Sequence, residues 1–275
     1  MSKTIMITGC SSGLGYDAAH GLAARGWRVF ATCRKAQDCE RLRSEGLESF
    51  QLDYASSESI NAAVAEVLSR TGGTLDALYN NGAFAMPGAV EDLPREGLRE
   101  IYETNLFGVH ELTCKIIPVM RAQGHGRIIN CSSVLGLVPM RWRGAYSSTK
   151  FALEGLTDTL RIEMRDTPLH IITVEPGPIT SDIRKNSIPP FERYVDWKAS
   201  PRRAQYEESL LARLYEARGP DRFELPASAV TKKLVHALES ARPKPRYFVT
   251  TPTYLMAAAR RLLPTRVLDW LIAKG

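Results

Sequence analysis

Short apolar runs alternate along this chain with longer segments in which apolar residues recur at helical spacing. The runs predict seven strands, at residues 4–8, 28–33, 48–53, 75–81, 126–133, 170–177 and 246–250. Helical patterns lie near residues 13–25, 58–70, 95–123, 147–166 and 226–240. Most of these apolar runs are continuous rather than alternating, which suits burial on both faces of a sheet. The pattern therefore predicts an α/β fold, a parallel sheet with helices on both sides.

Residues 182–225 interrupt this alternation. The segment is polar, mixed and bounded by prolines, and two short helices are expected within it. An insertion of this length is either a lid over a binding site or a poorly ordered loop. Its aromatic residues favour a substrate-binding lid.

The C-terminal segment 253–275 is a second exception, since it is apolar but carries four basic residues and one acidic residue. Pro264 divides this amphipathic tail into two short pieces. Packing over the substrate mouth or against a partner subunit is the preferred interpretation. Attachment to an anionic membrane surface is the alternative.

Composition and charge narrow the functional classes. A chain of 275 residues with 44% hydrophobic content can bury one large core, so residues 1–275 are expected to form a single domain. The net charge of +6 is spread without blocks of like charge. Because basic residues are not interleaved with stacking aromatics, no nucleic-acid partner is expected.

Cysteine and histidine spacing gives no sign of a metal site. The five cysteines contain no C-x-x-C pair, and the five histidines lack ligand spacing, so no metal is predicted. Reduced thiols, the absence of a signal-peptide pattern and the absence of an apolar run near ~18 residues predict a cytoplasmic protein.

The first predicted strand leads into a glycine-rich turn, "TGCSSGLG" at residues 8–15. Gly9 permits a tight turn, Gly13 lets the backbone approach a ligand, and Gly15 lets the next helix pack close to the strand. The helix N-terminus then offers free N–H groups to a pyrophosphate. This turn predicts a nucleotide site and a Rossmann-type, doubly wound sheet; a glycine turn without a ligand is the alternative.

Further motifs in the same chain order resemble those of the short-chain dehydrogenases/reductases. They are "NNGA" at 80–83, "ETNLFG" at 103–108, "CSSV" at 131–134, "YSSTK" at 146–150 and "EPGPI" at 175–179. The resemblance covers about residues 4–182 and continues weakly to about 250. The amino-acid sequences of these motifs are similar to those of the branch that contains steroid and retinol dehydrogenases.

The resemblance implies four catalytic residues. Tyr146 would be the general acid/base, and Lys150, one helical turn later, would favour its phenolate together with a positive nicotinamide and would bind the nicotinamide ribose. Ser133 would orient the substrate oxygen, with the adjacent Ser132 as the alternative. Asn105 would hold a water in a proton relay to the lysine.

The resemblance also implies a set of cofactor contacts. Asp53 would accept the adenine amino group, with a turn or helix cap as the alternative role, and Ile179 would meet the carboxamide. "NNGA" departs from the usual N-N-A-G, and Ser181 stands where threonine is more common. The expected cofactor-binding residues are Gly9, Ser11, Ser12, Gly13, Leu14, Gly15, Arg34, Lys35, Asp53, Asn81, Gly82, Tyr146, Lys150, Pro176, Gly177, Ile179 and Ser181.

The end of the second strand, "ATCRK", predicts a preference for NADP(H) over NAD(H). Cys33 occupies the position where an NAD enzyme of this fold commonly has a carboxylate for the ribose 2′-OH. Arg34 and Lys35 follow and suit a 2′-phosphate. Ser12 stands where the family's second basic signal is found, so the preference is expected to be incomplete.

These features together predict an NADP(H)-dependent oxidoreductase that interconverts an alcohol and its carbonyl. Apolar residues in 182–225 and between Ser133 and Tyr146 predict an apolar substrate, steroid-, retinoid- or lipid-like; ordinary packing is the alternative. A homodimer is expected through the helices near 99–123 and 147–166. A cofactor-sensing regulatory protein and a nucleotide-sugar epimerase are rival functions. Intact catalytic residues disfavour the first, and the glycine spacing disfavours the second.

Overall fold

The computed structural model describes residues 2–216, 219 and 221–273. In this part of the chain, seven strands form one sheet, all parallel, in the order β3-β2-β1-β4-β5-β6-β7. The strands are β1 (Thr4–Thr8), β2 (Arg28–Cys33), β3 (Glu48–Gln51), β4 (Ala77–Asn80), β5 (Gly126–Cys131), β6 (Leu169–Glu175) and β7 (Arg246–Phe248). Each coincides with a predicted strand, so the Rossmann-type fold is confirmed.

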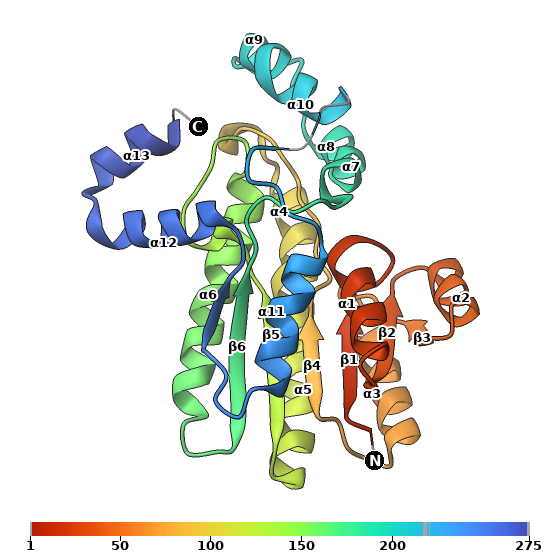
Figure 1. Ribbon diagram of the computed structural model, residues 1–275. Helices are drawn as coiled ribbons and strands as arrows, with labels where there is room; N and C mark the ends of the chain where they lie inside the picture. The colour runs from red at the N-terminus through yellow and green to blue at the C-terminus, as the bar shows by residue number, and fades with distance from the viewer. Residues whose placement is uncertain (1, 217–218, 220, 274–275) are drawn as a thin grey trace.

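Helices cover both faces of this sheet (Figure 1). One core joins α1, α2 and α11 to the sheet, and a second joins α3, α5 and α6 to the opposite face. The longer helices are α1 (Gly13–Ala23), α2 (Ala36–Ser44), α3 (Ser57–Thr71), α4 (Arg95–Tyr102), α5 (Gly108–Gln123), α6 (Gly144–Glu163) and α11 (Ser228–Glu239).

Two details of the sequence prediction were wrong. The helix α2 was not predicted, because only Cys39 and Leu42 of its nine residues are buried and its apolar pattern is too sparse. The predicted helix 95–123 is α4 and α5 joined by a π-helical turn, η2 (Glu103–Phe107). Inserted turns of this kind are frequent at functional sites.

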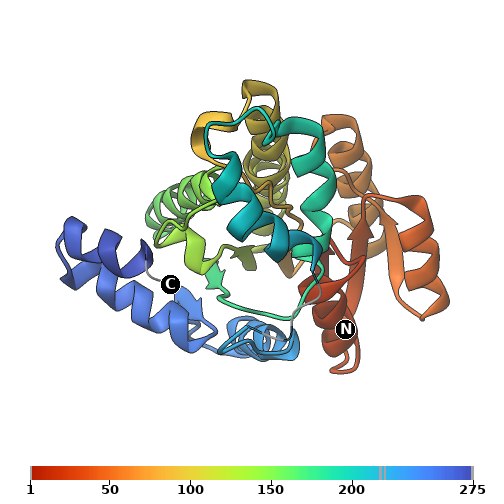
Figure 2. The same ribbon diagram turned by 90° about the horizontal axis from the view of Figure 1, so that it is seen from above.

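The segment 182–225 folds as a set of short helices above the carboxyl ends of the strands (Figures 1 and 2). These are α7 (Ile183–Asn186), α8 (Ile188–Tyr194), α9 (Arg203–Gln205), the π-helical η4 (Tyr206–Leu211) and α10 (Ala212–Tyr215). Residues of α8, η4 and α10 form a small separate core with Ala89 and Trp142, and the fully buried Phe191 and Tyr206 lie in it. Residues 217–218 and 220 of this segment lie outside the described residues.

The C-terminal tail forms α12 (Thr251–Leu262) and α13 (Thr265–Ala273), which Figure 1 shows extending beside α6. Pro264 separates the two helices as predicted. Their surface keeps apolar side chains exposed, Leu262 at 79% and Trp270 at 58%. None of the helices in residues 2–216 and 221–273 has the length and apolarity needed to span a membrane. Residues 274–275 of the predicted tail lie outside the described part.

The strand order reverses between β1 and β4. The loops that follow neighbouring strands diverge at such a point and leave a crevice at the carboxyl edge of the sheet, where ligands of this fold class bind. The glycine-rich turn follows β1, "NNGA" follows β4, and Ser133 follows β5. The topology thus brings the predicted site residues to one edge of the sheet.

Candidate active site

The glycine-rich turn between β1 and α1 has the backbone that its sequence predicts. Gly9 and Gly13 adopt φ of +69° and +58°, in the left-handed region that favours glycine. A Cβ on Gly15 would lie 2.4 Å from the Gly9 carbonyl oxygen, so only glycine lets α1 start this close to β1. Leu14 packs on the core beneath the turn, and Ser11 and Ser12 are partly exposed on it.

"NNGA" supports that turn from the next strand. The Asn81 amide Nδ2 donates to the carbonyl oxygens of Thr8 at 3.0 Å and Gly9 at 3.2 Å. The backbone N–H of Gly82 donates to the Thr8 hydroxyl at 3.0 Å. A Cβ on Gly9 would lie 2.6 Å from the Cα of Gly82, so the two loops touch through their backbones. Asn81 and Gly82 therefore help to fix the backbone conformation of the glycine-rich turn.

The loop after β6 completes the crevice. Pro176 accepts a hydrogen bond from the Val134 N–H at 2.8 Å, and a Cβ on Gly177 would collide with the Thr250 hydroxyl. Ser181, farther along this loop, lies against the glycine-rich turn: a Cβ on Gly13 would be 3.3 Å from the Ser181 Cβ. Ile179, which is partly buried, pairs with Leu225 at the end of the lid segment. This loop thus connects the glycine-rich turn to the lid.

Basic side chains lie where β2 ends. Arg34 and Lys35 are exposed, whereas Cys33 is 1% exposed and burial raises the pKa of its thiol to about 12. Sequence analysis missed Arg41, because α2 was not predicted. Its guanidinium donates to the Ser11 carbonyl oxygen at 2.6 Å and pairs with Glu45 at 3.0 Å. Arg41 therefore holds the glycine-rich turn from the side of α2.

The sequence predicted that Asp53 ends the third strand. This was wrong, because β3 ends at Gln51. The Asp53 carboxylate accepts from the Ala55 N–H at 3.0 Å, and the Asp53 N–H donates to the Ser59 hydroxyl of α3. These contacts are those of the alternative role, a turn cap. The carboxylate remains partly exposed beside the crevice.

Tyr146 and Lys150 lie on one face of α6, near its N-terminus, and are 8% and 3% exposed. The Lys150 ammonium is 5.5 Å from the centroid of the Tyr146 ring. It donates to the Cys131 carbonyl oxygen at 2.7 Å, which ties α6 to the end of β5. The i, i+4 spacing therefore brings the ammonium beside the phenol.

Burial dominates the protonation of both groups. It raises the pKa of the Tyr146 phenol, while a hydrogen bond from Ser133 and the charge of Arg143 act in the opposite direction. Burial also lowers the pKa of Lys150. From the sequence, Lys150 was the one protein charge expected to lower the pKa of Tyr146. In the structure, the charge of Arg143 opposes the rise in that pKa.

Ser133 rather than Ser132 faces the phenol. The Ser133 hydroxyl accepts from the Leu135 N–H at 3.1 Å and interacts with Tyr146. The Ser132 hydroxyl lies on the other side, beside Glu154 and Gly136. This arrangement favours Ser133 as the residue that contacts a substrate.

Asn105 is fully buried in the π-helical turn η2. Its side chain accepts from the Phe84 N–H at 3.0 Å and donates to the Phe84 carbonyl oxygen at 2.8 Å. It also donates to the Thr149 hydroxyl of α6 at 3.2 Å. The amide is thus used to join the loop after β4 to the helix that carries Tyr146 and Lys150.

Most lid aromatics are not at the phenol. Phe191 and Tyr206 lie in the lid's own core, where the Trp142 ring packs 4.6 Å from that of Tyr206. The apolar residues packed around Tyr146 include Leu135 and Phe84. For Phe191, Tyr206 and Trp142, the alternative of ordinary packing is therefore correct.

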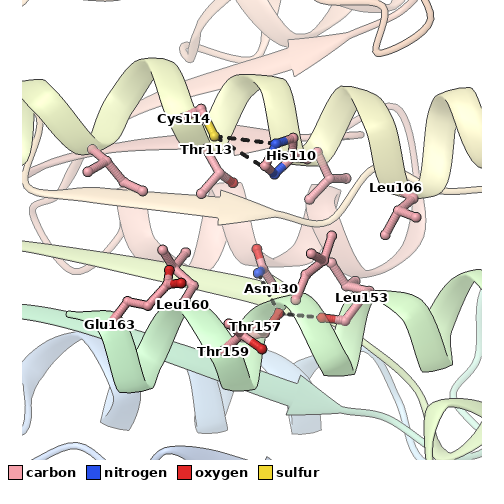
Figure 3. Close-up of a pocket in the computed structure, with 13 residues that line it drawn as sticks. Leu106, His110, Thr113, Cys114, Asn130, Leu153, Thr157, Thr159, Leu160 and Glu163 are labelled. Atoms are coloured by element: carbon pink, nitrogen blue, oxygen red, sulfur yellow. Dashed lines mark hydrogen bonds between the residues drawn. The ribbon is translucent and has the colours of Figure 1, made fainter. Parts of the chain in front are cut away.

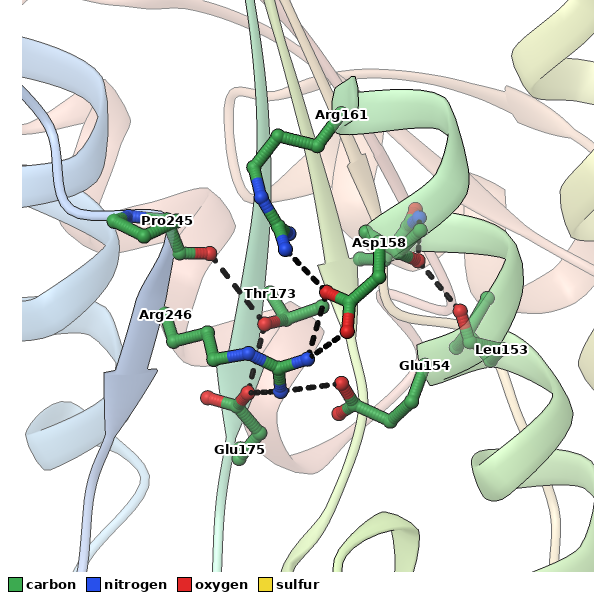
Figure 4. A network of polar contacts seen from close by, with 10 residues as sticks. Leu153, Glu154, Asp158, Arg161, Thr173, Glu175, Pro245 and Arg246 are labelled. Carbon is green, nitrogen blue, oxygen red and sulfur yellow. Dashed lines mark hydrogen bonds and ion pairs between the residues drawn. The ribbon is translucent and has the colours of Figure 1, made fainter. Parts of the chain in front are cut away.

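A partly buried ionic network continues along α6 (Figure 4). The Arg246 guanidinium of β7 binds Glu154 at 2.6 Å, Glu175 at 2.8 Å and Asp158 at 2.6 Å. Glu154 stands one turn after Lys150, and its charge raises the pKa of that ammonium against the effect of burial. Of this network, Glu154 therefore favours the charged form of Lys150.

An apolar groove lies elsewhere, on the outer surface between α5 and α6 (Figure 3). It has a volume of about 170 Å³. Its lining includes Leu106, Val109 and Ile117 from one side and Leu153, Leu156 and Leu160 from the other. None of the four catalytic candidates lines it, so the groove is separate from the crevice.

Comparison with known proteins agrees with this geometry. The model of the short chain dehydrogenase family matches residues 3–190. The chain is 37% identical to the uncharacterized oxidoreductase YbbO of Escherichia coli strain K12, over 98% of this chain and 93% of that one. It is 33% identical to 17-beta-hydroxysteroid dehydrogenase type 6 of Homo sapiens, over 99% and 88%.

Among solved structures, a short-chain dehydrogenase from Streptomyces avermitilis superposes with a TM-score of 0.79 at 26% identity, over 100% of this chain and 94% of that one. The family model covers more than half of the chain, and the similarity to a hydroxysteroid dehydrogenase is consistent with the steroid and retinol branch. The chain belongs to the short-chain dehydrogenase/reductase family of oxidoreductases.

Proposed function

We propose that this protein is an NADP(H)-dependent oxidoreductase that interconverts an alcohol and its carbonyl, with Tyr146 as general acid/base. The observation that carries the proposal is the placement of a buried phenol beside a buried ammonium and a serine hydroxyl. All three lie at the carboxyl edge of the sheet, on the same side as the glycine-rich turn.

The residues present fit a dinucleotide. The left-handed Gly9 and Gly13 and the crowded Gly15 leave the backbone N–H groups at the start of α1 open to a pyrophosphate. The exposed Arg34 and Lys35 suit a 2′-phosphate. The cofactor, when bound, supplies or accepts the hydride.

The chain's own residues handle the proton. In the reducing direction, the Tyr146 hydroxyl donates its proton to the carbonyl oxygen; in the oxidising direction, the phenolate accepts the alcohol proton. Ser133 holds that oxygen by a hydrogen bond. Lys150 stabilises the phenolate, and Asn105 positions α6 through Thr149. Burial of the phenol excludes bulk water from the proton transfer.

Substitution of the phenol tests this function. Tyr146→Phe should keep cofactor affinity and lose turnover by about three orders of magnitude or more, because it removes the proposed proton donor. Turnover is measured as NADPH consumption with a panel of ketones and aldehydes, and affinity by NADPH fluorescence. Tyr102→Phe, in the same apolar cluster, is the matched control. Tyr146→Phe turnover within threefold of wild type would exclude the assignment.

A further inference from the structure

Three arginines from separate segments lie close enough to interact through their charges, and one of them also acts on Tyr146. Arg143 immediately precedes α6, three residues before Tyr146, and Arg184 and Arg213 belong to the lid helices α7 and α10. Arg184 and Arg213 both bind the same carboxylate oxygen of Asp221, each at 3.2 Å. All three arginines are partly buried.

Arg143 lacks a partner of its own. Within residues 2–216, 219 and 221–273, its guanidinium makes no hydrogen bond and no ion pair. Burial, followed by the charges of Arg213 and Arg184, lowers the pKa of Arg143 to about 10, so it is still protonated at neutral pH. A partly buried cation beside two other cations is stabilised when an anion joins it.

The nearby carboxylates are already engaged. Asp221 is shared between Arg184 and Arg213, and its attraction is the smallest effect on the pKa of Arg143. Glu224 accepts hydrogen bonds from the Thr180 hydroxyl and the Asp221 N–H. The charge of Arg184 acts on it as well. Among the residues that the structure describes here, three guanidinium groups therefore stand against two carboxylates, and the excess positive charge is that of Arg143.

The backbone that presents Arg143 is strained. Trp142 has a φ of +66°, in the left-handed region that bulky residues avoid. The strain is held by the tilted packing of the Trp142 ring on the buried Tyr206 and by a hydrogen bond from the Gly88 N–H to the Trp142 carbonyl oxygen. Such strain concentrates at functional sites. Here it fixes where the chain enters α6 and therefore where Arg143 stands.

Resting on the proposed function, we propose that the substrate carries an oxyanion, a carboxylate or a phosphate, and that Arg143 binds it while Tyr146 acts on the carbonyl. The planar guanidinium offers paired N–H donors that match such groups. Leu135 and Phe84, packed around Tyr146, contact the apolar part of the same molecule. The substrate class is thus an amphipathic alcohol or carbonyl compound with an anionic group.

The position of Arg143 favours the substrate over the cofactor as the source of the anion. The candidate contacts for the cofactor's own phosphates are Arg34 and Lys35 after β2 and the turn at the start of α1. Arg143 is instead close enough to the Tyr146 phenol for its charge to lower the phenol's pKa. An anion bound there lies beside the reacting carbonyl.

Matched substrate pairs test the proposal. NADPH consumption is measured with 4-formylbenzoate, 4-formylphenyl phosphate and the uncharged methyl 4-formylbenzoate. For the wild type, we expect kcat/KM to be at least ~10-fold higher for one of the anions than for the ester. The anion with the larger increase in kcat/KM over the ester shows whether Arg143 binds a carboxylate or a phosphate. Arg143→Met should bring this ratio close to one, and Arg143→Glu should reverse it. Arg141→Met is the control, because Arg141 is exposed and pairs with Gln205.

A binding measurement separates this proposal from the proposed function. Calorimetry with p-toluate and p-toluamide, which carry no reducible aldehyde, should show tighter binding of the anion that Arg143→Met abolishes. If no aldehyde is reduced but this difference persists, the proposed function fails and the oxyanion site stands. An anion-to-ester ratio equal in wild type and Arg143→Met, with no p-toluate preference, overturns the oxyanion site alone. A change only in the KM for NADPH would also overturn it and assign Arg143 to the cofactor.

Discussion

At the scale of single residues, burial and charge compete at the head of α6. Burial moves the pKa of Tyr146 upward and that of Lys150 downward, so both groups are pushed toward their neutral forms. Arg143 opposes this at the phenol, and Glu154 opposes it at the ammonium. The two catalytic candidates therefore depend on charged neighbours on either side of them along the helix.

Cofactor choice depends on residues at the end of β2. Wild-type protein should show a kcat/KM at least ~10-fold higher for NADPH than for NADH, about 1.4 kcal/mol. The exposed Arg34 and Lys35 attract a 2′-phosphate, and no carboxylate stands at Cys33. Arg34→Ala should largely remove the preference. Arg43→Ala, on the far end of α2, is the control. Equal use of both cofactors by the wild type would contradict this interpretation.

Sequence analysis named the residues at this edge from motif order and the family resemblance. It did not find Arg143, Arg41 or Arg246, because none belongs to a motif. Their roles arise from interactions between segments far apart in sequence, such as the charges of Arg184 and Arg213 acting on Arg143 and the hydrogen bond of Arg41 to the Ser11 carbonyl oxygen. Such contacts appear only when the chain has folded.

At the scale of elements, Arg246 joins the edge strand β7 to β6 and α6. Its guanidinium lies among three carboxylates, of which Glu175 is fully buried (Figure 4). Burial, assisted by the charge of Glu154, raises the pKa of Glu175 from 4.5 to about 7. The network therefore carries more carboxylates than its cations neutralise.

This raised pKa makes stability depend on pH. The folded state holds the Glu175 proton more tightly than the unfolded state, so its contribution is complete below about pH 4.5 and is lost as the pH rises to about 7. Glu175→Gln cannot lose that proton. Between pH 5 and pH 8, the free energy of unfolding of the variant should therefore gain roughly 2 kcal/mol relative to wild type. Urea denaturation at both pH values measures it, and a pH-independent difference would refute it.

Strands β1, β4 and β5 were predictable because nearly all of their residues are buried, as expected in a sheet covered on both faces. The ends of the strands were less predictable, as β3 shows. Leu52 is buried like a strand residue, but Asp53 already caps the following turn. Helix α2 was missed because only Cys39 and Leu42 of its nine residues are buried. The division at η2 was missed because the π-helical turn continues the helical backbone between α4 and α5. The segment 182–225 was expected to contain two short helices and forms several, and Phe191 and Tyr206 pack in a small separate core instead of around the phenol.

At the scale of the whole molecule, the groove between α5 and α6 is an apolar surface outside the crevice (Figure 3). Leu156, on its rim, is 44% exposed, and Phe107 and Ile162 nearby are 50% and 65% exposed. The position agrees with the helices expected to face a partner subunit. Apolar surface of this kind is stabilised when a partner covers it.

We expect a homodimer assembled through these helices. Light scattering after size exclusion at micromolar concentration should give twice the chain mass of 30.5 kDa. Leu156→Glu should shift the protein to the monomer, because it places a charge in the apolar groove. Val90→Glu, at a residue 72% exposed near the lid, should leave the mass unchanged. A monomeric wild type would remove the claim.

The distribution of thiols over the fold has a practical consequence. Cys10, Cys33, Cys39 and Cys131 are buried, and of the five cysteines, all within the described residues, Cys114 alone is exposed. It lies on the wall of the α5–α6 groove (Figure 3). Native protein should therefore react with a maleimide at one position, and a dye attached there would report directly on whether a second chain covers the groove. The sequence thus carries an intrinsic single-site probe of its own association.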